Sequence, residues 1–271
     1  MTVIGIDTAA RVGGVAIVRD GRLLGGELFG VDAGHSEHLV PALARVMEAV
    51  GLEPGGVAGI AVSRGPGSFT GLRIGMAAAK ALAYAWKVPL VGVSTLLATA
   101  WTYGGVDAAV CASLDARREG VYRAWYDGLV LYGPPGGDGP GAGHGPSAED
   151  RPGAGDGAGE GDGSGEERVG IDEVAAEIER QLASGRRIVL VGDGSAAVRG
   201  AAARRLGRPE AELAALGVAT APLEGEAQRP ANTALIGERE LAMGRRDDAF
   251  ALVPNYLRRS EAERRWLQRQ S

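Results

Sequence analysis

Two predicted buried strands each end in an aspartate, whose carboxylate could take part in chemistry. Asp7 ends the apolar run Thr2–Thr8 and precedes the small-residue turn Ala9–Gly14. An aspartate in this place can hold a Mg²⁺-bound water while the N–H groups of the turn approach a phosphate. The other interpretation is that its carboxylate only accepts hydrogen bonds from the turn. Both stay open for Asp7, whereas the turn role is favoured for Asp115.

Two glycine-containing loops follow other predicted strands. Gly192 and Gly194 flank Asp193 after the strand Arg187–Val191, and would let the backbone approach an adenine nucleotide closely. The loop Gly65–Gly71 leaves N–H groups at the start of a helix, which is a potential anion site. That loop lacks the Lys-Ser/Thr ending of a Walker A loop. We therefore favour a tight turn that lets the following helix pack closely on the sheet.

Other reactive residue types are sparse. His35 and His38 lie three residues apart, but a zinc site needs three or four ligands, so we predict no metal site. Cys111 lies within an apolar strand and is predicted to be an inert core thiol. A single cysteine fits a reducing cytosol, and no apolar run approaches the ~20 residues that span a bilayer. The net charge of −5 argues against nonspecific nucleic-acid binding. We expect a cytoplasmic protein.

The elements that position these residues form two similar series. Each begins with an apolar strand that ends in aspartate, continues through a turn into a second strand, and then has an Asp-Gly hairpin turn. The first series is Thr2–Thr8, Val15–Val18 and Arg22–Phe29, and the second is Ala108–Leu114, Val121–Tyr126 and Leu129–Tyr132. The shared aspartate favours a duplication over chance. We predict an α/β protein with a first lobe in residues 1–105, a second in 106–245, and a C-terminal return with a basic tail in 246–271.

The second lobe is predicted to contain an insertion. Gly133–Glu167 has no Val, Ile, Leu or aromatic residue and is rich in glycine and acidic residues. Such a segment buries too little apolar surface to offset its ordering entropy, so we predict a flexible loop. A helix over Val169–Leu182 is expected to follow it.

Two helices of the first lobe have a composition typical of docking. Leu72–Trp86 carries small residues on nearly every face, which indicates a helix that is buried or docked on a partner. Ser36–Val50 has a second apolar set, Val40, Ala44 and Met47, besides its core stripe.

Several short motifs match one known family. They are Gly5-Ile6-Asp7-Thr8, His35–Leu39, the string GPGSFTGLRIG over Gly65–Gly75, Ala79–Ala83, Val88–Ser94, Asp115-Ala116-Arg117 and Pro254–Arg258. On these motifs the chain resembles the bacterial TsaB (YeaZ) family, closely over Thr2–Tyr126 and loosely beyond. The resemblance implies a fold of two duplicated lobes of the actin/Hsp70/sugar-kinase type. It also implies a role in making threonylcarbamoyladenosine, the modified base beside the anticodon of many tRNAs.

In that family a related subunit, TsaD, transfers the threonylcarbamoyl group, TsaE is the ATPase partner, and TsaB is the scaffold. The resemblance thus implies a noncatalytic subunit that requires no cofactor, reaches tRNA only through the complex and contacts no membrane. A homodimer is the alternative assembly when the partner is absent. The subunit contact falls on the two helices, at Val40, Ala44, Met47, Arg73, Ala77, Lys80, Ala81 and Tyr84.

The resemblance also bears on catalysis. TsaD carries a metal-binding His-x-x-x-His motif after the strand matching Pro89–Val93, where this chain has Thr95 and Thr99. Neither threonine replaces an imidazole as a ligand for iron or zinc. The alternative function is an ATP-dependent phosphotransferase or hydrolase that uses the Asp7 cleft, with Gly192 and Gly194 at the nucleotide, so ATP or ADP binding stays open.

Overall fold

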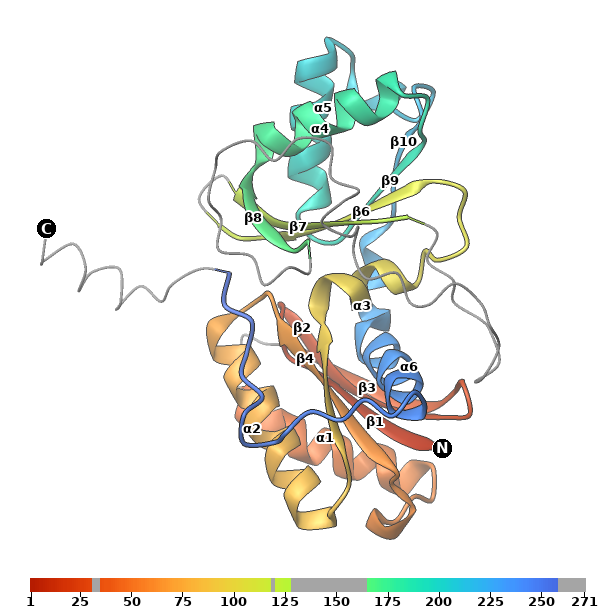
Figure 1. The fold of residues 1–271 in the computed structure, drawn as a ribbon, viewed down its shortest axis with the longest axis vertical. Helices are drawn as coiled ribbons and strands as arrows, with labels where there is room; N and C mark the ends of the chain where they lie inside the picture. Colours follow the sequence, from red (N-terminus) through yellow and green to blue (C-terminus); the bar gives the residue numbers. More distant parts are fainter. Residues whose placement is uncertain (31–34, 118–119, 128–164, 258–271) are drawn as a thin grey trace, which may run out of the picture.

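The chain folds into two lobes with one β-sheet each, as the computed structural model shows (Figure 1). The structure describes residues 1–30, 35–117, 120–127 and 165–257. The first-lobe elements are β1 (Thr2–Asp7), β2 (Val12–Arg19), β3 (Arg22–Gly30), α1 (His35–Ala49), η2 (Pro54–Gly56), β4 (Gly59–Gly65), α2 (Phe69–Trp86), β5 (Leu90–Ser94) and α3 (Thr95–Trp101). The later elements are β6 (Ala109–Asp115), β7 (Gly120–Tyr126), β8 (Glu167–Gly170), α4 (Ile171–Ala183), β9 (Ile188–Val191), α5 (Ser195–Leu206), η3 (Glu210–Glu212), β10 (Val218–Thr220), η4 (Leu223–Gln228) and α6 (Arg229–Ala242).

The two sheets have the same topology. The strand order is β3-β2-β1-β4-β5 in the first and, read in the matching direction, β8-β7-β6-β9-β10 in the second. In each sheet the first three strands along the chain pair antiparallel and the last two are added in parallel. Asp7 and Asp115 both end the central strand, opposite Gly14 and Val121 respectively. The predicted duplication of two α/β lobes is confirmed.

Alternation along the strands of the first sheet divides its core into two layers. Ile4 and Ile6 face α1 and α2, where they pack with Leu43 and Met76. Val3 faces the opposite side, and its cluster contains residues of α3 and α6. Successive side chains point to opposite faces of a strand, and both sets are buried because helices cover both faces of the sheet.

Helix α6 lies within the range expected for the second lobe, yet it packs on β1, β2 and β4 of the first sheet. Glycine allows this close approach at two points. A Cβ on Gly237 would lie 2.2 Å from Ala61 Cβ, and a Cβ on Gly5 would lie 2.3 Å from the Pro230 carbonyl oxygen. Residues 229–242 therefore contribute to the core of the first lobe.

The third strand of the second lobe differs from the prediction. The expected strand Leu129–Tyr132 and residues 133–164 of the expected insertion lie outside the described residues. The observed strand is β8, in which Val169 pairs with Val121. The predicted helix over Val169–Leu182 is therefore wrong at its start, because α4 begins at Ile171 after the pairing ends. The predicted insertion also extends too far, since Glu166 is buried at 2% exposure.

Candidate functional site

Asp7 is buried against a cation of the same chain. Its side chain is fully buried, and its Oδ2 lies 3.2 Å from Nε of Arg229, which is equally buried. Asp7 Oδ1 accepts a hydrogen bond of 2.9 Å from the Ala9 N–H, and Arg229 donates from Nη2 to the Val12 carbonyl at 3.0 Å. The carboxylate is thus engaged by a cation and an N–H group of the chain itself. This corresponds to the turn role and makes the carboxylate less available to a Mg²⁺-bound water.

The loop between β4 and α2 is packed onto the turn after β1. A Cβ on Gly71 would lie 1.9 Å from the Thr8 carbonyl oxygen, and one on Gly67 would lie 2.4 Å from the Ala9 carbonyl oxygen. The Ser68 N–H donates to the Ala9 carbonyl at 2.6 Å, and the Ser68 hydroxyl caps α2 by accepting from the Gly71 N–H. The helix starts at Phe69, three residues earlier than predicted, because Ser68 is its N-cap. The N–H groups of Ser68 and Gly71 are thus engaged by oxygen atoms of the chain itself, which supports the tight-turn interpretation.

The glycines after β9 approach the protein's own backbone. A Cβ on Gly192, whose φ is +94°, would lie 2.2 Å from the Ser113 carbonyl oxygen, and the Gly194 N–H donates to that oxygen at 3.0 Å. The Asp193 carboxylate accepts from the Asp115 N–H at 2.8 Å. Close packing on the end of β6 accounts for these glycines without a nucleotide.

Thr95 and Thr99 lie on α3 between the two lobes. Both are buried, and the Thr99 hydroxyl donates to the Thr95 carbonyl at 2.8 Å. The Thr95 hydroxyl is fully buried and has no hydrogen-bond partner among the described residues. Within those residues no three His, Cys, Asp or Glu side chains gather as a metal site would require. Hydroxyl groups alone are weak ligands for a transition metal.

The two helices predicted to dock on a partner, α1 and α2, are neighbours (Figure 1). Most of the predicted contact residues on them are exposed. On α1, Val40 is 54% exposed, and Ala44 is exposed one turn later. On α2, four of the predicted contact residues are exposed and follow the helical spacing; they are Arg73, Ala77, Ala81 and Tyr84. Lys80 is half-buried beside them. We call these seven residues the α1–α2 surface.

Met47 does not belong to this surface. It is 8% exposed and packs in the core cluster of the first lobe with Leu43 and Val46. Its place in the contact set is a wrong prediction, because position 47 is one turn after Leu43 and therefore lies on the core face. Val40 and Ala44, which are also one turn apart, are on the outer face.

Sequence reasoning missed an aromatic cluster beside α2. The rings of Phe69 and Tyr256 have centroids 4.8 Å apart, and the Arg73 guanidinium carbon lies 3.9 Å above the Phe69 ring. Nearby in sequence, Phe250 is 85% exposed and Val253 is 67% exposed. The run Pro254–Arg258 is a family motif, and its tyrosine is the sequence signal that could indicate this cluster.

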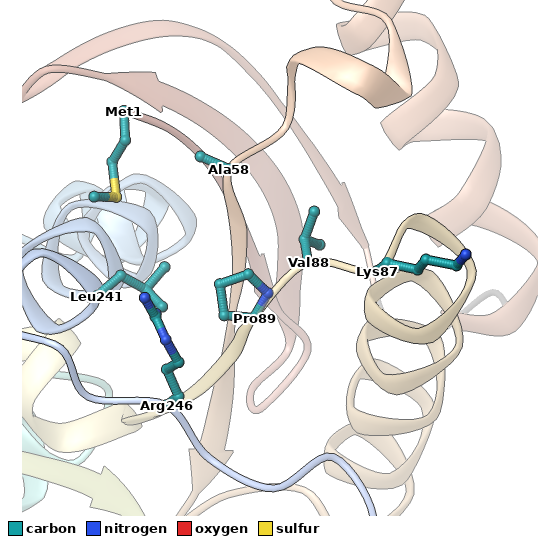
Figure 2. Close-up of a pocket in the computed structure, with 7 residues that line it drawn as sticks. All are labelled: Met1, Ala58, Lys87, Val88, Pro89, Leu241 and Arg246. Carbon is teal, nitrogen blue, oxygen red and sulfur yellow. The ribbon is translucent and has the colours of Figure 1, made fainter.

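A hollow of about 520 Å³ lies at the other end of the first sheet, where the chain enters β5. Figure 2 shows Pro89 at its centre, with the Arg246 side chain directed toward Leu241 and the Lys87 side chain directed away from the hollow. None of the residues selected from the sequence lines it. Since its two cations do not converge, we assign it no role in the candidate site.

Comparisons with known proteins agree with the motifs. A family model described as TsaD, tRNA N6-adenosine threonylcarbamoyltransferase, matches residues 31–131. TsaB of Escherichia coli (strain K12), a tRNA threonylcarbamoyladenosine biosynthesis protein, is 35% identical over 129 residues, which cover 46% of this chain and 55% of that protein. TsaB of Bacillus subtilis (strain 168) is 32% identical over 126 residues, which cover 46% and 55% of the two chains. The chain thus spans about half the length of the curated relatives it matches.

Among solved structures, YeaZ from Pseudomonas aeruginosa superimposes with a TM-score of 0.59 at 21% identity, covering 94% of this chain and 99% of that one. A second structure, of an uncharacterized protein with similarity to peptidase YeaZ from Pseudomonas aeruginosa, gives a TM-score of 0.61 at 22% identity and covers 95% and 99%. At these identities the likeness concerns the fold.

Two lobes with the same five-stranded topology place the chain in the actin/Hsp70/sugar-kinase class of folds. Within that class, the curated matches and the motifs of the first lobe confirm its resemblance to the TsaB (YeaZ) family. No described helix has the length and apolar character that a membrane crossing needs.

Proposed function

We propose that this chain is a noncatalytic scaffold subunit in the synthesis of threonylcarbamoyladenosine on tRNA. Its partner is a TsaD-type transferase that docks on the α1–α2 surface, and a TsaE-type ATPase completes the assembly in the cytoplasm. In the absence of the partner the same surface supports a homodimer. The chain requires no cofactor and meets tRNA only through the complex.

One observation carries the proposal: the outer face of α2 is exposed although it is built from small and apolar side chains. Ala77 and Ala81 stand one turn apart on that face, and Tyr84 beside them is 75% exposed. Small residues let a partner helix approach closely, and an exposed aromatic side chain provides an anchor at its edge. By contrast, Asp7, Gly192 and the loop before α2 are engaged by the protein's own groups.

The test is association with the TsaD-type subunit from the same organism. The wild-type chain is expected to co-elute with it as a stable 1:1 complex in size-exclusion chromatography and to transfer nothing to tRNA alone. Ala77→Arg and Ala81→Arg place a long charged side chain on the exposed face of α2, so each is expected to abolish co-elution without unfolding the chain. Ala183→Arg, at an exposed helical position of the second lobe, is the matched control.

Retention of co-elution by both α2 variants would refute docking on this surface. A cellular measurement completes the test. In a strain depleted of its own TsaB, the wild-type chain together with its partner is expected to restore threonylcarbamoyladenosine, measured by mass spectrometry of tRNA nucleosides. The Ala81→Arg variant is expected not to restore it.

A further inference from the structure

The C-terminal segment Asp247–Leu257, here called the strap, runs along the first lobe from the end of α6 to the start of α2 (Figure 1, dark blue). It begins at β5, an edge strand, where the Asp247 N–H donates to the Leu90 carbonyl at 2.9 Å. Leu252 packs against the core of the first lobe. Further along, the Asn255 N–H donates to the Arg64 carbonyl at 2.6 Å. The strap is therefore attached at its start, middle and end.

The end of the strap holds a residue of the α1–α2 surface. Arg73 donates from Nε to the Tyr256 hydroxyl at 3.0 Å, while its guanidinium lies over the Phe69 ring, which in turn packs on the Tyr256 ring. An exposed arginine ordinarily samples many rotamers, and a fixed one loses less entropy when it binds. Tyr256 and Phe69 fix the orientation of Arg73 before any partner arrives.

The donors of Arg73 that are not bonded to Tyr256 determine which kind of group the side chain can bind. No carboxylate of the described residues forms an ion pair with it, and α2 contains Arg73 and Lys80 but no acidic residue. A guanidinium whose Nε is already engaged still offers its two Nη groups, which suit a carboxylate. The α1–α2 surface is thus apolar with two cations, although the whole chain carries a net charge of −5. Its complement is an apolar helix face that bears a carboxylate.

The strap is also anchored to the second lobe. Asn255, next to Tyr256, donates from Nδ2 to Glu166 at 2.9 Å, and Glu166 also accepts from the Ser94 hydroxyl at the end of β5. The same buried patch holds Tyr126, whose pKa is raised well above its usual value, chiefly by burial and also by the charge of Glu166. The position of Tyr256 is therefore set by both lobes.

We infer that the strap is part of the docking site and that Tyr256 is a positioning residue, which presents Arg73 to a carboxylate of the TsaD-type partner. This inference rests on the proposed function and names the chemistry that the partner surface must have. Phe250 and Val253, exposed on the same strap, extend the apolar area available to that partner.

A double-mutant cycle on the dissociation constant of the complex tests the inference, with isothermal titration calorimetry as the assay. Arg73→Ala is expected to weaken binding by about 10- to 100-fold, because it removes a charge-assisted contact. It should also reduce the dependence of binding on salt. Tyr256→Phe, which keeps the ring and removes only the hydroxyl, is expected to weaken binding by about 2- to 10-fold. The double variant should bind as weakly as Arg73→Ala alone, since Tyr256 acts through Arg73.

Arg199→Ala, which breaks an exposed ion pair on α5, is the control and should bind as the wild type does. Losses that multiply in the double variant, or a Tyr256→Phe variant with wild-type affinity, would overturn the positioning role. If Arg73→Ala also keeps wild-type affinity while Ala81→Arg abolishes binding, the inference fails and the proposed function stands. If both Ala77→Arg and Ala81→Arg bind normally, the proposed docking surface itself fails.

Discussion

Replacing Asp7 by asparagine tests whether its carboxylate stabilises the fold or binds a nucleotide. The substitution keeps the size of the side chain but removes the negative charge of the carboxylate, whose Oδ2 lies 3.2 Å from Nε of the fully buried Arg229. Removing one member of a buried ion pair costs about 3–5 kcal/mol, because the attraction that offset the desolvation of the other charge is lost. Out of a total stability of about 5–15 kcal/mol this is a large fraction, and it lowers the melting temperature by roughly 6–20 °C.

Urea unfolding followed by tryptophan fluorescence measures this loss. Arg229→Met should cost a similar amount, and the Asp7→Asn/Arg229→Met double variant should lose clearly less than the sum of the two, since an apolar replacement tolerates burial. Calorimetric titration with MgATP is run on the same proteins. If the wild type binds MgATP with micromolar affinity, and Asp7→Asn abolishes that binding while changing the unfolding free energy by less than about 1 kcal/mol, the structural reasoning is refuted and the kinase-like alternative gains support.

Three further outcomes follow from packing and burial. Gly71→Ala brings a Cβ to 1.9 Å from a backbone oxygen of the β1–β2 turn and should cost at least about 2 kcal/mol in urea unfolding; Gly55→Ala, with no atom nearby, should be close to neutral. Met47→Ala should cost about 2–5 kcal/mol because it opens the core, whereas Val40→Ala should change stability by less than about 0.5 kcal/mol and instead weaken the complex in calorimetry. Burial raises the pKa of the Cys111 thiol to about 12, from 9.0. A disulfide reagent at pH 8 should therefore modify no thiol until the chain is denatured. Rapid labelling of the native chain would contradict this burial. Since the thiol of the unfolded chain ionises first, its contribution to stability should fall as the pH rises from 9.0 toward 12.

Features set by nearby residues could be predicted from the sequence. The first sheet's strands, the Asp20-Gly21 hairpin and the duplicated aspartates depend on alternation and turn chemistry within a few residues. Asp20 and Gly21 indeed have positive φ values of 51° and 74°. The exposed stripe of α2 follows from helical spacing in the same way.

Features set by distant partners could not be predicted. The Asp7–Arg229 pair joins residues 222 positions apart, and nothing near Arg229 in sequence indicates that it is buried. The hydrogen bond between Asn255 and Glu166 could not be predicted either, because Glu166 lies in the segment predicted to be a flexible insertion. The prediction for Met47 was wrong for another reason. An apolar residue on α1 can pack in the core or contact a partner, and only the packing of the helix shows which of the two it does.

The packing of the loop Gly65–Gly71 on the β1–β2 turn accounts for the glycines of this chain's most diagnostic motif without a bound anion. Glycines that let a backbone approach a phosphate also let it approach a carbonyl, and here Gly67 and Gly71 face the Ala9 and Thr8 carbonyl oxygens. A carbonyl oxygen satisfies the same N–H donors as an anion would, as the bond from Ser68 to Ala9 shows. The start of α2 is therefore held rigidly against β1. That rigidity is what a docking helix needs, because a surface fixed before binding loses less entropy on association. The motif thus positions the outer face of α2, because its glycines pack on the β1–β2 turn.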